Sequence, residues 1–169
     1  MPRDHARIKT ARAHDLDWRD LTQEAQWTYD AIVTQEGLSH AGVIDYRPGR
    51  IAALAKNGTV RKVETAVKTL EDARFVVVDR LTEELLVRSF VRHDGVFDRA
   101  NMGKAVGRAF AKVVSTTVRQ ALIAEMARHY RDNPGLAGWH GMRDLYPDVM
   151  AQVEAMASTV PFPMASREA

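Results

Sequence analysis

The sequence predicts a mainly α-helical chain with one small β-hairpin. Two observations support this prediction: most apolar residues recur three or four positions apart, and two short β-prone segments stand on either side of a polar link. With 169 residues the chain is long enough for one ordinary domain and a helical extension. We do not expect two separate large cores.

The first long helix is expected to begin after Thr22 and to end near Gly37. The hydroxyl of Thr22 can accept a hydrogen bond as the N-cap. A loop then leads into a short strand that ends at Asp45, because the residues before it are β-branched. The inward side chains of this helix are expected to be Ala25, Tyr29, Ile32 and Val33.

Two further helices are expected to follow with a tight turn between them. Pro48 suits the opening turn of a helix over 49–56, and Asn57-Gly58 favours a left-handed turn. Thr59 can cap the next helix, which we place over 59–73. The inward residues are expected to be Ile51, Leu54 and Ala55 in the former helix, and Val60, Val63, Val67 and Leu70 in the latter.

A hairpin completes this part of the chain. The strand-type segments 75–78 and 85–90 are joined by the polar link 79–84. Three helices, a short strand and a hairpin in this order predict a winged helix-turn-helix domain over residues 1–95. Its third helix would be the one that enters a DNA groove.

Residues 96–160 are expected to form a helical C-terminal region, and 161–169 a loose tail. Ser115 can cap one of its helices, 133–135 should end that helix, and Pro147 can open the last one. The expected inward side chains are Met102, Val106, Ala109, Phe110 and Val113, then Val118, Ala121, Leu122 and Met126, and finally Val149, Met150, Val153 and Met156.

The sequence lacks the residues that several functional classes require. Cysteine is absent, which excludes a disulfide framework, a cysteine-ligated zinc and a thiol nucleophile. The histidines show no metal-binding spacing, and no phosphate loop or nucleophile elbow occurs. We therefore expect no metal, no cofactor and no enzymatic activity. Trp18, Trp27 and Trp139 are interpreted as packing anchors.

Two basic segments stand out in a chain whose net charge is only +2. Residues 47–68 carry six bases and one acid, and 99–119 carry five bases and no acid. On the polar side of the expected third helix, bases and a threonine could contact guanine edges, phosphates or a thymine methyl. The alternative is a solvated helix face. The candidate DNA-binding residues are Arg47, Arg50, Thr59, Arg61, Lys62, Thr65, Lys68 and Arg80.

Within this set the expected roles differ. Arg80 at the hairpin, with Arg47 and Arg50, would contact phosphates and fix the register. Glu83 and Glu84 would repel the DNA backbone, so we expect the hairpin tip to lie off the groove or to touch it only through Arg80.

A second basic stripe recurs every four residues in the C-terminal region. It consists of Lys104, Arg108 and Lys112, opposite an apolar face. The stripe could contact flanking phosphates, form a dimer or partner surface, or simply be the solvated side of an amphipathic helix. The opposite apolar face explains the helix without a ligand, which favours the solvated face.

Segments 38–43, 70–79 and 82–96 resemble the helix-turn-helix proteins of actinobacterial phages, which are similar to replisome-organiser or replication-initiation proteins. The resemblance covers roughly residues 6–100 and is most specific in the hairpin. It implies a winged-helix fold, binding to double-stranded DNA, and a role in phage replication or its control. No apolar run is long enough to cross a bilayer, so we expect a cytoplasmic protein of the bacterial host cell, with no membrane partner.

Three functions remain open on these grounds. The first is a phage-type protein that initiates or organises DNA replication. The second is a transcriptional repressor or regulator whose C-terminal helices form a homodimer. The third is a winged helix that binds a host replication or transcription factor instead of DNA.

Overall fold

The structure of the chain is a computed structural model that describes residues 10–159. It is mainly helical, as the sequence predicts. The predicted hairpin and the predicted short strand together form a three-stranded antiparallel sheet, a pairing that the sequence analysis did not predict. The expected tail over 161–169 lies outside the described residues. In order, the elements are the 3₁₀ helix η1 (Thr10–His14), α1 (Leu16–Arg19), α2 (Gln23–Val33), β1 (Val43–Asp45), α3 (Pro48–Ala52), α4 (Val60–Asp72), β2 (Val76–Asp79), β3 (Glu84–Val87), α5 (Phe90–His93), α6 (Ala100–Ala111), α7 (Thr116–Asp132), α8 (Ala137–Leu145) and α9 (Pro147–Thr159).

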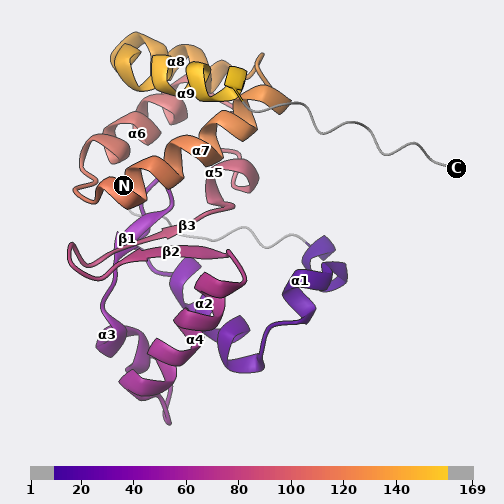
Figure 1. Cartoon of the computed structure of the whole chain (residues 1–169), viewed down its shortest axis with the longest axis vertical. Coiled ribbons are helices and arrows are strands. Elements are labelled where there is room, and N and C mark those ends of the chain that lie inside the picture. Colours follow the sequence, from indigo (N-terminus) through magenta and orange to yellow (C-terminus); the bar gives the residue numbers. More distant parts are fainter. Residues whose placement is uncertain (1–9, 160–169) are drawn as a thin grey trace, which may run out of the picture.

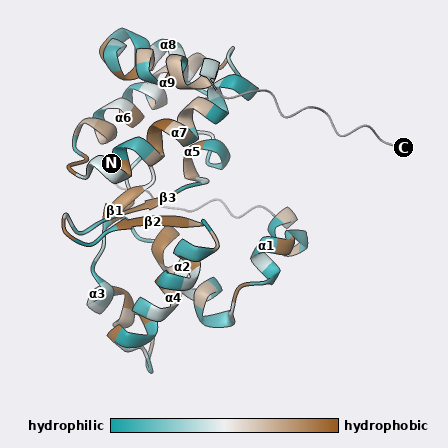
Figure 2. Cartoon of the chain, in the orientation of Figure 1, coloured by the Kyte–Doolittle hydropathy of each residue, from teal (hydrophilic) through white to brown (hydrophobic). Residues whose placement is uncertain are grey.

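The sheet lies in the middle of the molecule, between two groups of helices (Figure 1). Helices α2, α3 and α4 lie on one side of it, and α6 to α9 lie on the other. The strands are among the most hydrophobic segments of the ribbon (Figure 2). In β3, three consecutive residues are fully buried: Leu85, Leu86 and Val87. In a strand with one face exposed to solvent, buried and exposed side chains would alternate. Both faces of the sheet are therefore covered.

Helix α2 begins as predicted. The Thr22 hydroxyl accepts a hydrogen bond from the amide of Ala25, 3.2 Å away. Ala25, Tyr29 and Ile32 are buried, and Val33 is partly buried. The helix ends at Val33, earlier than the expected Gly37.

Helix α3 is shorter than predicted. It begins at Pro48 but ends at Ala52. Beyond it the amide of Leu54 bonds to the carbonyl of Ile51, in the tighter i to i−3 pattern. This tightening turns Leu54 outward, and the residue is 58% exposed instead of facing inward. Ile51 is buried as predicted.

Gly58 is needed for a different reason from the one expected. It does not have a positive φ, so the left-handed turn predicted for Asn57-Gly58 is wrong. A Cβ at Gly58 would instead lie 1.9 Å from the carbonyl oxygen of Ala52. The close approach of the two backbones requires glycine here.

Helix α4 is capped by Thr59, whose hydroxyl accepts a hydrogen bond from the Lys62 amide. Its inner side is buried as predicted at Val63, Val67 and Leu70. Val60 was expected to be buried with them, which is wrong: it is the first residue of the helix, and it is 46% exposed there.

The C-terminus of α4 is closed without glycine. Arg74 has a φ of 62°, in the left-handed region. The amide of Phe75 bonds to the carbonyl of Leu70, and the amide of Arg74 bonds to that of Glu71. These two bonds are those of a Schellman motif, with arginine at the position that usually holds glycine. The motif turns the chain directly into β2.

The hairpin is confirmed, with strands shorter than expected. The sheet order is β1-β3-β2, and Val76 is paired with Val87 and Val43 with Leu86. The second strand was expected to reach Phe90 but ends at Val87, because Phe90 begins α5.

The C-terminal region is helical, as predicted. The hydroxyl of Ser115 caps α7 by accepting a hydrogen bond from the Val118 amide, and Pro147 opens α9. Helix α8 was not expected. Its backbone lies against α6 so closely that a Cβ at Gly103 would lie 1.8 Å from the carbonyl oxygen of Gly138. The expected inward residues of this region are buried, except for Met102, Ala109, Ala121 and Met156, which are partly buried against the core.

Two of the three tryptophans are packing anchors. Trp18 and Trp139 are buried, and Trp139 stacks on Phe97 with the ring centroids 3.6 Å apart. The same role predicted for Trp27 is wrong, because this residue of α2 is exposed at the surface. Within residues 10–159, no helix is both long and apolar enough to span a bilayer.

Candidate nucleic-acid interface

The outer face of α4 carries the candidate contact residues. Arg61, Thr65 and Lys68 lie one turn apart on the side opposite the buried stripe, and all three are exposed. Lys62 lies beside this row and is also exposed. Glu64, an exposed acid, flanks the row on its other side.

The basic side chains on this face differ in whether they bond to other groups of the protein. Lys68 forms an ion pair with Asp72, one turn further along α4. The Nζ of Lys62 donates a hydrogen bond to the carbonyl of Asn57, 3.3 Å away. Arg61 has no polar partner among the described residues. Thr59 is occupied as the cap of the helix.

Arg47 is the residue before α3, and Arg50 lies within this short helix. Arg47 forms ion pairs with Asp45 at 3.6 Å and with Glu83 at 3.3 Å. Arg50 is exposed, and within residues 10–159 its side chain makes no ion pair. Arg50 could therefore contact a phosphate without breaking an internal ion pair, whereas Arg47 could not.

Arg80 lies in the turn of the hairpin, as expected, but its side chain is folded back onto α4. Its guanidinium makes two hydrogen bonds to the Glu71 carboxylate, at 2.7 and 3.3 Å, and lies 5.8 Å from the ring centroid of Tyr46. The hydrogen bond to Glu71 raises the pKa of Arg80 above its ordinary value. The next residue of the turn, Leu81, is 93% exposed.

The two glutamates of the hairpin both have internal partners. Glu84 accepts hydrogen bonds from the amides of Val114 and Ser115, at 2.9 and 2.5 Å, just before α7. Glu83 faces Arg47. The repulsion expected between these acids and a DNA backbone is thus partly offset within the protein.

The basic stripe of α6 lies on the other side of the sheet from α4 (Figure 1). Lys104 is partly buried, and Arg108 and Lys112 are exposed. The sheet therefore separates α6, which carries the stripe, from α4. At the end of the stripe, however, Lys112 lies with Arg47 and Arg50 around a shallow hollow of about 420 Å³.

The sequence analysis missed an ionic cluster between the sheet and α7. Glu125 of α7 has a side chain only 2% exposed and is paired with Arg88 at 2.7 Å and Arg92 at 3.1 Å. The signal was present in the sequence, because position 125 continues the inward stripe of Val118 and Leu122. An acid in such a stripe indicates a buried ionic partner.

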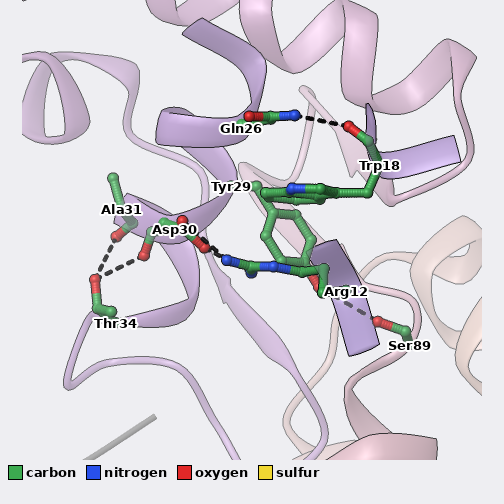
Figure 3. A network of polar contacts seen from close by, with 8 residues as sticks. All are labelled: Arg12, Trp18, Gln26, Tyr29, Asp30, Ala31, Thr34 and Ser89. Atoms are coloured by element: carbon green, nitrogen blue, oxygen red, sulfur yellow. Dashed lines mark hydrogen bonds and ion pairs between the residues drawn. The ribbon is translucent and has the colours of Figure 1, made fainter. Parts of the chain in front are cut away.

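A second cluster joins the N-terminal segment to α2 (Figure 3). The Arg12 guanidinium lies 4.0 Å from the ring centroid of Trp18 and forms an ion pair with Asp30 at 2.7 Å. The ring of Tyr29 lies edge-on to Trp18, and its hydroxyl lies 3.3 Å from that of Ser89. Burial raises the pKa of Tyr29 above its ordinary value.

The outer face of α4 offers cations and the hydroxyl group of Thr65. Among the described residues, no three histidine or acidic side chains gather closely enough to hold a metal ion. No protein-family model, curated protein or solved structure matches this chain.

Proposed function

We propose that this chain is a DNA-binding protein that docks α4 in the major groove of a duplex. In this proposal α2, α3, α4 and the β2-β3 hairpin form a winged helix-turn-helix domain. The observation that carries it is the exposed row Arg61, Thr65 and Lys68 on the helix that follows the tight turn after α3.

The energetics of the internal ion pairs are compatible with such docking. Three candidate bases, Arg47, Lys68 and Arg80, are paired with acids, but all three remain about half exposed or more. Exposed pairs contribute only about 0–1 kcal/mol each. A phosphate can therefore replace the acid at little cost, whereas Arg61 and Arg50 bring charge without giving up a partner.

The biological role that we propose is the initiation or organisation of phage DNA replication. This part of the proposal is supported by the resemblance of the hairpin and of segment 38–43 to phage replication proteins. In a transcriptional repressor, the helices after the hairpin would instead pair two copies. A palindromic footprint over a promoter would favour that role, and a footprint over an origin would favour replication.

The test is a titration of the chain with DNA fragments of the parent genome. Binding is measured by fluorescence anisotropy at several salt concentrations. The double variant Arg61→Ala, Lys62→Ala should bind more weakly, and the slope of log K against log salt should fall by about one unit for each phosphate that the variant no longer neutralises. The matched control is Lys104→Ala, Arg108→Ala, which removes the same charge from α6. Unchanged binding of the first pair would contradict docking through α4, as would a larger loss for the α6 pair than for the α4 pair.

A further inference from the structure

A cavity of about 690 Å³ opens where α1, α2 and the end of α4 meet β3, α5 and α7. Small-molecule sites in proteins commonly enclose about 300–1,000 Å³. One wall of this cavity is aromatic and the other is rich in arginine. We propose that it binds a small aromatic acid, that is, a planar ring carrying a carboxylate or phosphate group. This proposal does not depend on DNA binding.

The aromatic wall consists of Trp18, Tyr29 and Phe75. Each ring meets the other two edge to face, with centroids 5.4 to 5.9 Å apart. Trp18 and Tyr29 are buried, whereas Phe75 is only partly buried. The wall is held in place by its own contacts. Arg12 already covers the ring of Trp18 at 4.0 Å, so the partly exposed ring of Phe75 is the one that a ligand can stack on.

The opposite wall carries excess positive charge. Arg88 and Arg92 share the single carboxylate of Glu125, so this group alone has a net charge of +1. The Nε of Arg92 is buried and lies 3.1 Å from the carboxylate but outside hydrogen-bond geometry. The pair of arginines thus keeps donor capacity that Glu125 does not use.

The rim adds further charge of both signs. Arg128 lies one turn after Glu125 on α7, is exposed, and has no polar partner within the described part of the chain. Of the acids, Asp15 is used to cap α1, where it accepts from the amides of Asp17 and Trp18. Across the whole lining, five arginines (Arg12, Arg74, Arg88, Arg92 and Arg128) stand against four carboxylates (Asp15, Asp17, Asp94 and Glu125), and the charge of Arg12 is already paired with Asp30 outside the lining. The positive charge available to a ligand therefore comes from Arg88, Arg92 and Arg128.

An aromatic acid is the ligand class that satisfies both walls. A neutral ring would cover the arginines without offering them an acceptor, which is costly for a desolvated charge. A bare inorganic anion would leave the exposed part of the Phe75 ring in contact with water. A ring with an anionic group stacks on the first wall and accepts hydrogen bonds from the second.

The test uses four probes of simple structure: phenyl phosphate, benzoate, phenol and inorganic phosphate. Each is titrated into the full chain and followed by two-dimensional NMR. We expect the two aromatic acids to bind with a Kd on the order of 1 mM, and phenol and inorganic phosphate roughly tenfold more weakly. The shifted amides should belong to residues that line the cavity. Equal binding of inorganic phosphate, or no binding of any probe at about 10 mM, would overturn the proposal.

Two variants locate the site. Arg128→Gln should weaken phenyl phosphate about twofold to fivefold, because it removes one exposed charge. Phe75→Leu should weaken it about threefold to tenfold, because it removes an aromatic face. Arg19→Gln is the matched control, since Arg19 is an exposed base of α1 that does not line the cavity. Arg128→Gln changes only an exposed side chain and should not affect folding. It therefore tests the site even if Phe75→Leu fails to fold. If both cavity variants bind like the control, the assignment is wrong.

Discussion

The hydroxyl of Ser115 donates a hydrogen bond of 2.6 Å to the carboxylate of Asp79, at the end of β2. The same hydroxyl accepts from the amide of Val118 as the N-cap of α7. One side chain therefore begins the longest described helix and fastens it to the hairpin. Together with Glu84, which accepts from the amides of Val114 and Ser115, it fixes the C-terminal helices to the sheet.

Replacing Ser115 with alanine should destabilise the protein by about 1–2 kcal/mol, because the variant has no side-chain cap on α7. Urea denaturation followed by circular dichroism measures this change. Thr116→Ala is the matched control, because Thr116 is exposed and caps nothing. A Ser115→Ala variant as stable as the control would show that the cap contributes nothing.

Asp79 should make the protein sensitive to acid. The hydrogen bond from Ser115 lowers the pKa of Asp79 below its ordinary value of 3.8. A carboxyl with a lowered folded pKa contributes stability above its unfolded pKa, and this contribution is lost as the pH falls through the folded value. In Ser115→Ala the pKa of Asp79 should rise toward 3.8. A carbon-13 NMR titration of the carboxyl between about pH 2 and 6 measures both values, and identical midpoints would contradict this account.

Glu125 should be the most sensitive ionic residue among those described. Its removal leaves two adjacent arginines without their shared anion. Breaking a buried pair typically costs about 3–5 kcal/mol, and since both arginines are about one quarter exposed, we expect about 2–3 kcal/mol for Glu125→Ala. Glu154→Ala, which breaks the half-exposed pair with Arg143, should cost below about 1 kcal/mol. Thermal unfolding measures the loss of stability in each variant. Similar losses would contradict the expectation that the buried carboxylate contributes more to stability than the half-exposed one.

Arg74→Gly should stabilise the protein. An L-residue in the left-handed region costs roughly 1–2 kcal/mol, and glycine relieves this cost while making the unfolded chain more flexible. We expect a net gain of about 0.5–1 kcal/mol. Arg74→Ala removes the same charge but keeps the strain, so it should give no gain. If both variants behave alike in chemical denaturation, the effect comes from charge and not from backbone geometry.

Gly58→Ala should destabilise the turn between α3 and α4. The new Cβ would meet the carbonyl of Ala52 at 1.9 Å, and backbone atoms have to move to accommodate it. Overpacking of this kind costs about 1–3 kcal/mol. Gly49→Ala, where the added Cβ meets nothing within 4 Å, is the control. A tolerated Gly58→Ala in a calorimetric scan would show that the backbones can separate without cost.

The elements that follow local rules could be predicted from the sequence. Thr22, Thr59 and Ser115 cap helices as expected, because an N-cap depends on a side chain and an amide two or three residues later. Helix α8 was missed because its two glycines lower its helix propensity, and what holds it is the close approach of its backbone to α6. That approach joins residues far apart in the chain, so no local pattern reveals it.

The candidate interface was predictable only in part. The row on α4 follows from helical spacing, and its residues are exposed as expected. The partner of Arg80 does not follow from spacing, because Glu71 reaches it only when β2 folds back beside α4. The same holds for the arginines that converge on Glu125 from the end of β3 and from α5.

The most direct test of the central claim is an NMR map of the chain bound to a genomic DNA duplex. Docking through α4 predicts that the largest amide shifts fall at Arg61, Lys62, Thr65 and Lys68, with smaller shifts at Arg50 and at the hairpin tip around Leu81. Helices α8 and α9 should remain unchanged. Shifts confined to the C-terminal helices, or no shifts at low salt, would contradict the account.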